Sequence, residues 1–122
     1  PGSFIRPTVF SEVTTDMTIA QDEIFGPVLG IIPVQSVEQA IQIARDTDYG
    51  LHATLFTRDI DRAIHTARAL PCGTVSINGF SEGDIKTPFG GYKLSGSMFT
   101  TLQLRVLSQK SEKLFVYVMY YA

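Results

Sequence analysis

The stretch Asp22-Glu23-Ile24-Phe25-Gly26-Pro27-Val28 places a carboxylate and an aromatic ring beside a corner of the backbone. Pro27 fixes its own φ and biases Gly26 away from the helical region, so the chain turns stiffly there into an apolar run. A carboxylate accepts hydrogen bonds from neighbouring hydroxyl groups, so Glu23 and Phe25 could together hold a polar, flat ligand. In the alternative interpretation, Glu23 closes a short helix or pairs with a nearby base, and Phe25 is a core residue.

Cys72 is the single cysteine of the chain, and the sequence gives it no catalytic partner. It stands between a helix-ending proline and a glycine, and neither His52, at a strand start, nor His65, on a helix, is placed to be its base. We interpret Cys72 as structural and expect no catalytic residue in this chain. These three residues also lack the spacing of a metal ligand set, so we expect no metal site.

A polar loop, Gly79 to Pro88, follows the end of a predicted strand, where open α/β sheets place their ligands. We expect this loop to contact substrate. Its Glu82 and Asp84 are either solvated surface charges or an acidic pair that favours a substrate with a cationic tail. The next stretch, Gly90 to Ser95, has glycines and a lysine but lacks the spacing of a phosphate-binding loop, so we interpret it as tight packing.

The elements that must position these residues alternate between strands and helices. Predicted strands cover Val28–Val34, Leu51–Thr57 and Thr74–Asn78, with short links to the helices between them. This order predicts right-handed crossovers and a parallel sheet, hence an α/β fold with βαβαβ connectivity. Because Val28–Val34 is apolar throughout, we expect both of its faces to be covered. The stretch Phe4 to Phe10 is interrupted by Pro7 and should lie outside the main sheet.

The predicted helices carry recognisable caps and apolar stripes. Ser36 and Gln39 form a capping box, and Asp59 caps the second helix. A further short turn, Met17 to Gln21, is expected to be capped by Thr15-Asp16. The two stripes that should face the sheet are Val37, Ala40, Ile41 and Ala44 in the first helix, and Ile60, Ala63, Ile64, Ala67 and Leu70 in the second.

Composition narrows the class of protein. The chain has 122 residues, 44% apolar and 18% charged, which is typical of one soluble globular domain. Its net charge of −2 offers no basic field, so we expect no nucleic-acid partner. The most apolar stretch, Leu114 to Ala122, is shorter than the roughly 20 residues of a membrane-spanning helix, so we expect no membrane partner. One cysteine indicates a reducing compartment, the cytoplasm.

Two motifs resemble those of the NAD(P)-dependent aldehyde dehydrogenase family: Glu23-Ile24-Phe25-Gly26-Pro27-Val28 and Pro88-Phe89-Gly90-Gly91-Tyr92-Lys93-Leu94-Ser95-Gly96. The resemblance implies NAD or NADP as cofactor, with Glu23 on the nicotinamide ribose hydroxyls and Phe25 near the nicotinamide. It implies that Phe89 lines the passage by which the aldehyde arrives. The run Asn78 to Gly96 is also similar to members that accept aminoaldehydes from polyamine breakdown, which would assign substrate selection to Glu82 and Asp84.

The resemblance also implies an organisation. Residues 1–97 match the C-terminal part of the catalytic domain, 98–110 form a divergent connector, and 111–122 form a C-terminal oligomerisation strand. Leu114 to Tyr121 is an uncharged, β-prone run, so we expect a homo-oligomer in which it joins a neighbouring subunit.

The chain begins with Pro-Gly and no initiator methionine, which we interpret as a piece of a longer enzyme whose upstream part is missing. That enzyme would oxidise an aldehyde to a carboxylic acid with NAD(P)+ through a cysteine thiohemiacetal. Because the resemblance puts the nucleophile and the general base in the missing part, we expect this chain alone to be inactive. The alternative is a non-catalytic binding or assembly module derived from the family.

Overall fold

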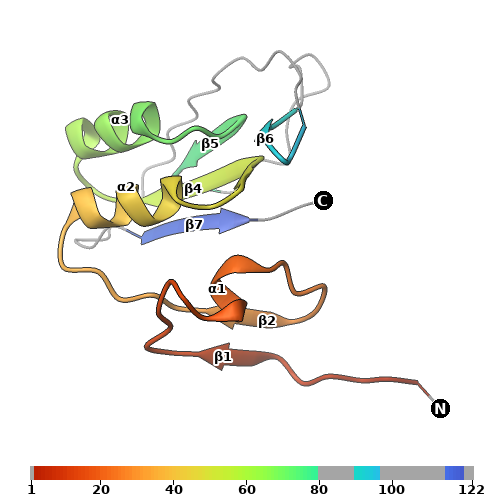
Figure 1. Ribbon diagram of the computed structural model, residues 1–122. Coiled ribbons are helices and arrows are strands. Elements are labelled where there is room, and N and C mark those ends of the chain that lie inside the picture. The colour runs from red at the N-terminus through yellow and green to blue at the C-terminus, as the bar shows by residue number, and fades with distance from the viewer. Residues whose placement is uncertain (1, 80–89, 97–114, 120–122) are drawn as a thin grey trace. The chain divides into compact units, whose positions relative to one another are not determined.

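The computed structural model describes residues 2–79, 90–96 and 115–119 (Figure 1). The chain divides into two compact units, Pro1–Gln35 and Ser36–Ala122. None of the helices in the described ranges has the length and apolarity that crossing a bilayer requires. The division into residues 1–97, 98–110 and 111–122 stays a prediction.

The first unit contains β1 (Thr8–Phe10), α1 (Thr18–Gln21) and β2 (Val28–Gly30). β1 begins directly after Pro7 and pairs in parallel with β2 as a two-stranded sheet, so it lies outside the larger sheet, as predicted. The expected strand from 28 to 34 is shorter than predicted. Val28 and Ile32 are half-buried, whereas Leu29, Ile31 and Val34 are exposed, so the two faces of the run are not both covered as predicted.

The cap predicted for the short helix α1 is wrong. Its N-cap residue is Met17, and no side chain accepts a hydrogen bond from the free backbone amides. Asp16 instead accepts a hydrogen bond from the Thr14 hydroxyl, an exposed local contact that lowers the pKa of Asp16. The side chain of Gln21 donates to the Thr15 carbonyl at 3.0 Å, which ties the end of this single helical turn back to the segment before it.

The second unit is built on a three-stranded sheet of order β5-β4-β7 (Figure 1). β4 (His52–Phe56) pairs in parallel with β5 (Thr74–Ile77) and antiparallel with β7 (Phe115–Met119). Two helices, α2 (Val37–Arg45) and α3 (Ile60–Ala69), belong to this unit. A separate ribbon joins β3 (Tyr49–Gly50) antiparallel to β6 (Tyr92–Lys93).

The α/β class with parallel strands is therefore confirmed, and the connection β4-α3-β5 has the predicted form. The full βαβαβ sheet is not formed, because β2 pairs with β1 in a sheet of its own. The sequence pattern identified β2, β4 and β5 but neither β3 nor β6, and the choice of partner strand depends on contacts far apart in the sequence.

The N-cap residues predicted for both helices of the second unit, Ser36 and Asp59, are confirmed as hydrogen-bond acceptors. The Ser36 hydroxyl accepts a hydrogen bond from the backbone N–H of Gln39 at 3.0 Å. The Asp59 carboxylate accepts one from the backbone N–H of Arg62, also at 3.0 Å. The buried face of α2 is Ala40, Ile41 and Ala44, as predicted. For α3 the predicted stripe is partly wrong. Ile60 is 49% exposed and the buried face is Ala63, Thr66 and Ala67, so the helix presents small side chains to the sheet.

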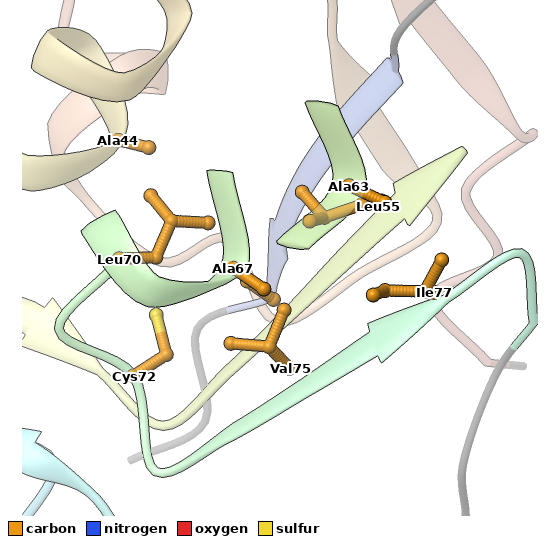
Figure 2. Packing of buried hydrophobic residues seen from close by; sticks show 9 residues of the cluster. Ala44, Leu55, Ala63, Ala67, Leu70, Cys72, Val75 and Ile77 are labelled. Atoms are coloured by element: carbon orange, nitrogen blue, oxygen red, sulfur yellow. The ribbon is translucent and has the colours of Figure 1, made fainter. Parts of the chain in front are cut away.

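The core lies between α3 and one face of β4 and β5 (Figure 2). Ala63 and Ala67 lie over Leu55 of β4 and over Val75 and Ile77 of β5 (Figure 2). Small residues on the helix let it approach the branched side chains of the sheet closely, which is the packing that a covered parallel sheet needs. Leu70 and Cys72 close the cluster at the end of α3, and Ala44 joins it from α2.

Candidate functional site

The corner around Gly26 is tightly folded, as the Gly-Pro pair predicts. Gly26 N–H donates to the Ile24 carbonyl at 2.7 Å, and Val28 N–H donates to the Gly26 carbonyl at 2.8 Å. Each bond spans two residues, which is γ-turn geometry. Apart from its two chain neighbours, no described residue has an atom within 4 Å of the place where a Cβ on Gly26 would stand, so that space is open in the described part of the chain.

Glu23 stands between the end of α1 and this corner, with its side chain half-buried. Its Oε2 atom is buried, and no donor among the described residues bonds it. A buried polar atom without a partner costs about 1 to 3 kcal/mol, so a site of this kind gains free energy when a donor arrives. The alternative interpretation, in which Glu23 is paired with a nearby base, has no support in the described part of the chain.

Phe25 lies on the same corner and is 82% exposed. Its ring is therefore not a core residue of the unit that contains it. An exposed ring two residues from an unsatisfied carboxylate can pack on a flat, polar ligand while the carboxylate binds its hydroxyl groups.

The predicted tight packing of Gly90 to Ser95 holds at its two glycines, Gly90 and Gly91, which are buried, whereas Tyr92 and Leu94 are exposed. A Cβ on Gly73 would overlap the backbone carbonyl of Gly90, and a Cβ on Gly91 would stand 2.7 Å from the Ser95 Cβ. Leu94 N–H donates to the Asp48 carbonyl at 3.0 Å. These contacts fill the space beside Gly73 and Gly91, so neither of these glycines offers room for a phosphate.

The predicted substrate residues Glu82, Asp84 and Phe89 lie outside the described residues, but the chain on both sides of them is described. On one side, Asn78 is buried with a positive φ of 55°, and its side chain exchanges two 2.8 Å hydrogen bonds with the Thr57 backbone. On the other side, Gly90 is buried against Gly73. Sequence reasoning missed Asn78, although asparagine is enriched among residues with positive φ.

Cys72 is buried in the core at the end of α3 (Figure 2). Burial raises the pKa of its thiol to about 11, against a smaller opposite effect of the Lys93 charge. A thiol that stays protonated at neutral pH is not a nucleophile. His52 is also buried, which lowers the pKa of its imidazole, and its Nε2 lies 3.1 Å from the Thr54 hydroxyl. Within the described ranges, no three His, Cys, Asp or Glu side chains gather as metal ligands.

Comparisons with known proteins support the family resemblance that the two motifs indicated. A model of the aldehyde dehydrogenase family matches residues 1–106. Retinaldehyde dehydrogenase 3 of Homo sapiens is 52% identical over 96 residues, which are 79% of this chain and 19% of that protein. The mitochondrial aldehyde dehydrogenase family 2 member B4 of Arabidopsis thaliana is 53% identical over 96 residues, 79% of this chain and 18% of that protein.

A solved structure shows the same similarity in three dimensions. The crystal structure of an aldehyde dehydrogenase from Mycobacterium tuberculosis, complexed with NAD+, matches with a TM-score of 0.74 and 50% identity. The match covers 77% of this chain and 19% of that chain. The protein described here therefore spans about 19% of the length of such relatives.

Proposed function

The chain belongs to the aldehyde dehydrogenase family, and from this premise we propose that it supplies the nicotinamide-ribose contact and part of the aldehyde passage of a complete enzyme. That enzyme oxidises an aldehyde to a carboxylic acid and reduces NAD+ or NADP+. Because the chain spans about 19% of its relatives' length, the remaining parts of the active site come from sequence outside it.

The buried, unpartnered Oε2 of Glu23 is the observation that carries this proposal. The family's cofactor contains a ribose with two adjacent hydroxyl groups, and hydroxyl donors are what this oxygen lacks. Gly26 leaves the space beside the corner open, and Phe25 offers an exposed ring next to it. The Glu23 carboxylate, an acceptor, thus fits the ribose hydroxyls, and the Phe25 ring fits the flat nicotinamide.

When bound, the nicotinamide supplies the hydride acceptor of the reaction. Glu23 accepts hydrogen bonds from the ribose hydroxyls and so fixes the rotation of the adjoining ring. Phe25 packs beside that ring and excludes water from it. The thiolate that forms the thiohemiacetal with the aldehyde must come from outside this chain, because Cys72 is buried and protonated.

For the substrate, the proposal assigns Phe89 to the wall of the aldehyde passage and Glu82 and Asp84 to selection of a cationic tail. The two acidic side chains would favour an aminoaldehyde over a carboxylate-bearing aldehyde. The support is their position in the chain, between Asn78 and Gly90, both of which the structure anchors.

We also propose a homo-oligomer formed through Leu114 to Tyr121, in the cytoplasm. In the single chain, β7 already pairs with β4 in the register His52↔Met119 to Phe56↔Phe115. One edge of β7 is thus covered by the chain's own sheet, in which β7 is the terminal strand. An oligomer would exchange β7 between copies and reuse this register. The same exchange would serve the alternative function, an assembly module without catalysis.

The substitution Glu23→Gln in the complete enzyme tests the cofactor contact. We expect the pre-steady-state rate of hydride transfer to fall on the order of tenfold to a hundredfold, because a hydrogen bond to a charged acceptor is worth about 1.5 to 3 kcal/mol. Glu12→Gln is the matched control, since Glu12 is an exposed carboxylate in the same unit. An unchanged hydride-transfer rate in Glu23→Gln would remove Glu23 from the site.

A further inference from the structure

We propose that one face of the β1–β2 sheet, the docking face, binds the part of the enzyme that lies outside this chain. The docking face is defined by the side chains of Val9, Leu29 and Ile31. This inference rests on the proposed function, because it requires a complete enzyme of which this chain is a part.

The three side chains of the docking face lie together and are exposed. The parallel register pairs Val9 with Leu29, and the Ile31 N–H continues the ladder by donating to the Phe10 carbonyl at 2.8 Å. Because side chains alternate between the two faces of a strand, Val9, Leu29 and Ile31 share one face. They are 61%, 40% and 47% exposed. A sheet face made of three exposed, branched apolar side chains is typical of a contact surface.

The opposite face of the same sheet is covered from within the first unit. A Cβ on Gly30 would stand 3.6 Å from a methyl group of Val13 and 3.8 Å from Ile19 of α1. Val13 is the single buried apolar side chain among the described residues of the first unit. A unit of 35 residues with a two-stranded sheet and so small a core is marginally stable in water. The first unit therefore needs a permanent partner on its docking face.

The partner that fits is the rest of the same enzyme. Surfaces that stay covered permanently are more apolar than transient ones and resemble a domain core cut in half. The family model matches residues 1–106, so the first unit belongs to the part that is shared with the relatives. The 96 residues matched in retinaldehyde dehydrogenase 3 are 19% of that protein, so its polypeptide has much sequence beyond the shared part. We assign the docking face to an apolar surface of that additional sequence.

Docking of this face would also position the cofactor corner. The Pro27 carbonyl of the corner accepts a hydrogen bond from the Thr8 N–H at 2.9 Å. Val28 follows directly and begins β2 in register with Thr8. A shift of the sheet therefore moves the corner that carries Glu23 and Phe25, and a covered docking face holds both side chains in place.

The test compares how fast a maleimide reagent labels two isoleucine positions after each is replaced by cysteine. Ile31 and Ile60 are 47% and 49% exposed, and Ile60 is the matched control because it stands between the charged residues Asp59 and Asp61 at the start of α3. In the 122-residue chain, Ile31→Cys and Ile60→Cys should both be labelled rapidly, whereas the native Cys72 is buried. In the full-length enzyme we expect labelling at position 31 to slow about tenfold or more, because a buried thiol is shielded from the reagent, with position 60 unchanged. Mass spectrometry of the peptides that contain each position gives the two rates.

Labelling at position 31 that is as fast in the full-length enzyme as in the 122-residue chain would overturn the inference. Protection of position 31 already in the 122-residue chain would mean that this chain or a second copy covers the face, which would overturn the choice of partner. If Ile31→Cys does not fold, Val9→Cys, a substitution of nearly equal size on the same face, is labelled in its place. The labelling needs no turnover, so an enzyme that oxidises no aldehyde would contradict the proposed function without changing this result.

Discussion

Glu23 has one buried carboxylate oxygen that no described residue bonds, whereas the Cys72 thiol lies in an apolar cluster. The two side chains differ in their surroundings, and this difference determines which of them can take part in the site. An unsatisfied acceptor beside open space can accept a hydrogen bond from a ligand. A thiol whose pKa is raised to about 11 by burial stays protonated at neutral pH.

The buried thiol makes stability depend on pH in a defined window. The folded state holds the Cys72 proton up to about pH 11, whereas the unfolded thiol releases it near its ordinary value of 9.0. Below pH 9 both states are protonated and stability is at its full value; from pH 9 to 11 only the unfolded state loses its proton, so stability falls. The difference of two pKa units corresponds to about 3 kcal/mol.

This decline can be measured by urea denaturation of the chain at pH 8 to 11. We expect Cys72→Ala to remove the part of the decline that the thiol causes, while other groups that titrate there continue to contribute. A decline of equal size in Cys72→Ala would show that the thiol is not the cause.

At the scale of residues, the sequence predicted the features that depend on residues adjacent in the chain. It found the Glu23 corner and judged Cys72 structural, because turn residues and neighbours carry that information. It missed Asn78 and Lys93, since their partners Thr57 and Arg45 lie 21 and 48 residues away. Such contacts depend on the packing of the whole unit, so no local sequence pattern predicts them.

At the scale of elements, the caps of α2 and α3 are local hydrogen bonds and were predicted correctly. The pairing of β2 with β1 was not predicted, because the partner of a strand depends on which strand lies nearest in space. The rotation of α3 was missed for a similar reason. Ile60 fits the apolar periodicity, but the helix approaches the sheet through Ala63, Thr66 and Ala67, which are small enough to allow close contact.

The cap of α3 gives a prediction at this scale. Asp59→Ala removes the acceptor of the Arg62 amide, so we expect the free energy of unfolding to fall by about 1 kcal/mol. Asp61→Ala removes an equal charge from the first turn of the same helix without removing its N-cap acceptor, so its effect should be smaller. Urea denaturation of both variants gives the comparison, and equal losses would mean that charge and not capping stabilises the helix.

At the scale of the whole molecule, the proposed homo-oligomer depends on β7. Phe115–Met119 pairs with a β4 whose Ala53, Thr54 and Leu55 are fully buried, so this edge has much to gain from a partner strand. A β7 that is exchanged between copies keeps the burial of about five large side chains, roughly 1.5 to 3 kcal/mol each, that it has within one chain, so the exchange loses none of it. We expect dimers or larger species by sedimentation at micromolar concentration.

Deletion of residues 112–122 should convert those species to monomers, whereas removal of residues 1–3 should not. A monomer with the tail intact would mean that β7 stays on its own sheet, the pairing that the single chain shows. The oligomer and its strand exchange would then be abandoned, while the cofactor contact at Glu23 would be unaffected.

The central claim is that this chain carries part of an aldehyde dehydrogenase active site and needs the rest of the enzyme to act. Aldehyde-dependent formation of NADH or NADPH, measured side by side for the 122-residue chain and for the full-length protein that contains it, tests this most directly. We predict turnover by the full-length protein and none by the chain, because Cys72 cannot serve as the nucleophile. Turnover by the chain alone, or a full-length protein that oxidises no aldehyde with either cofactor, would contradict the account.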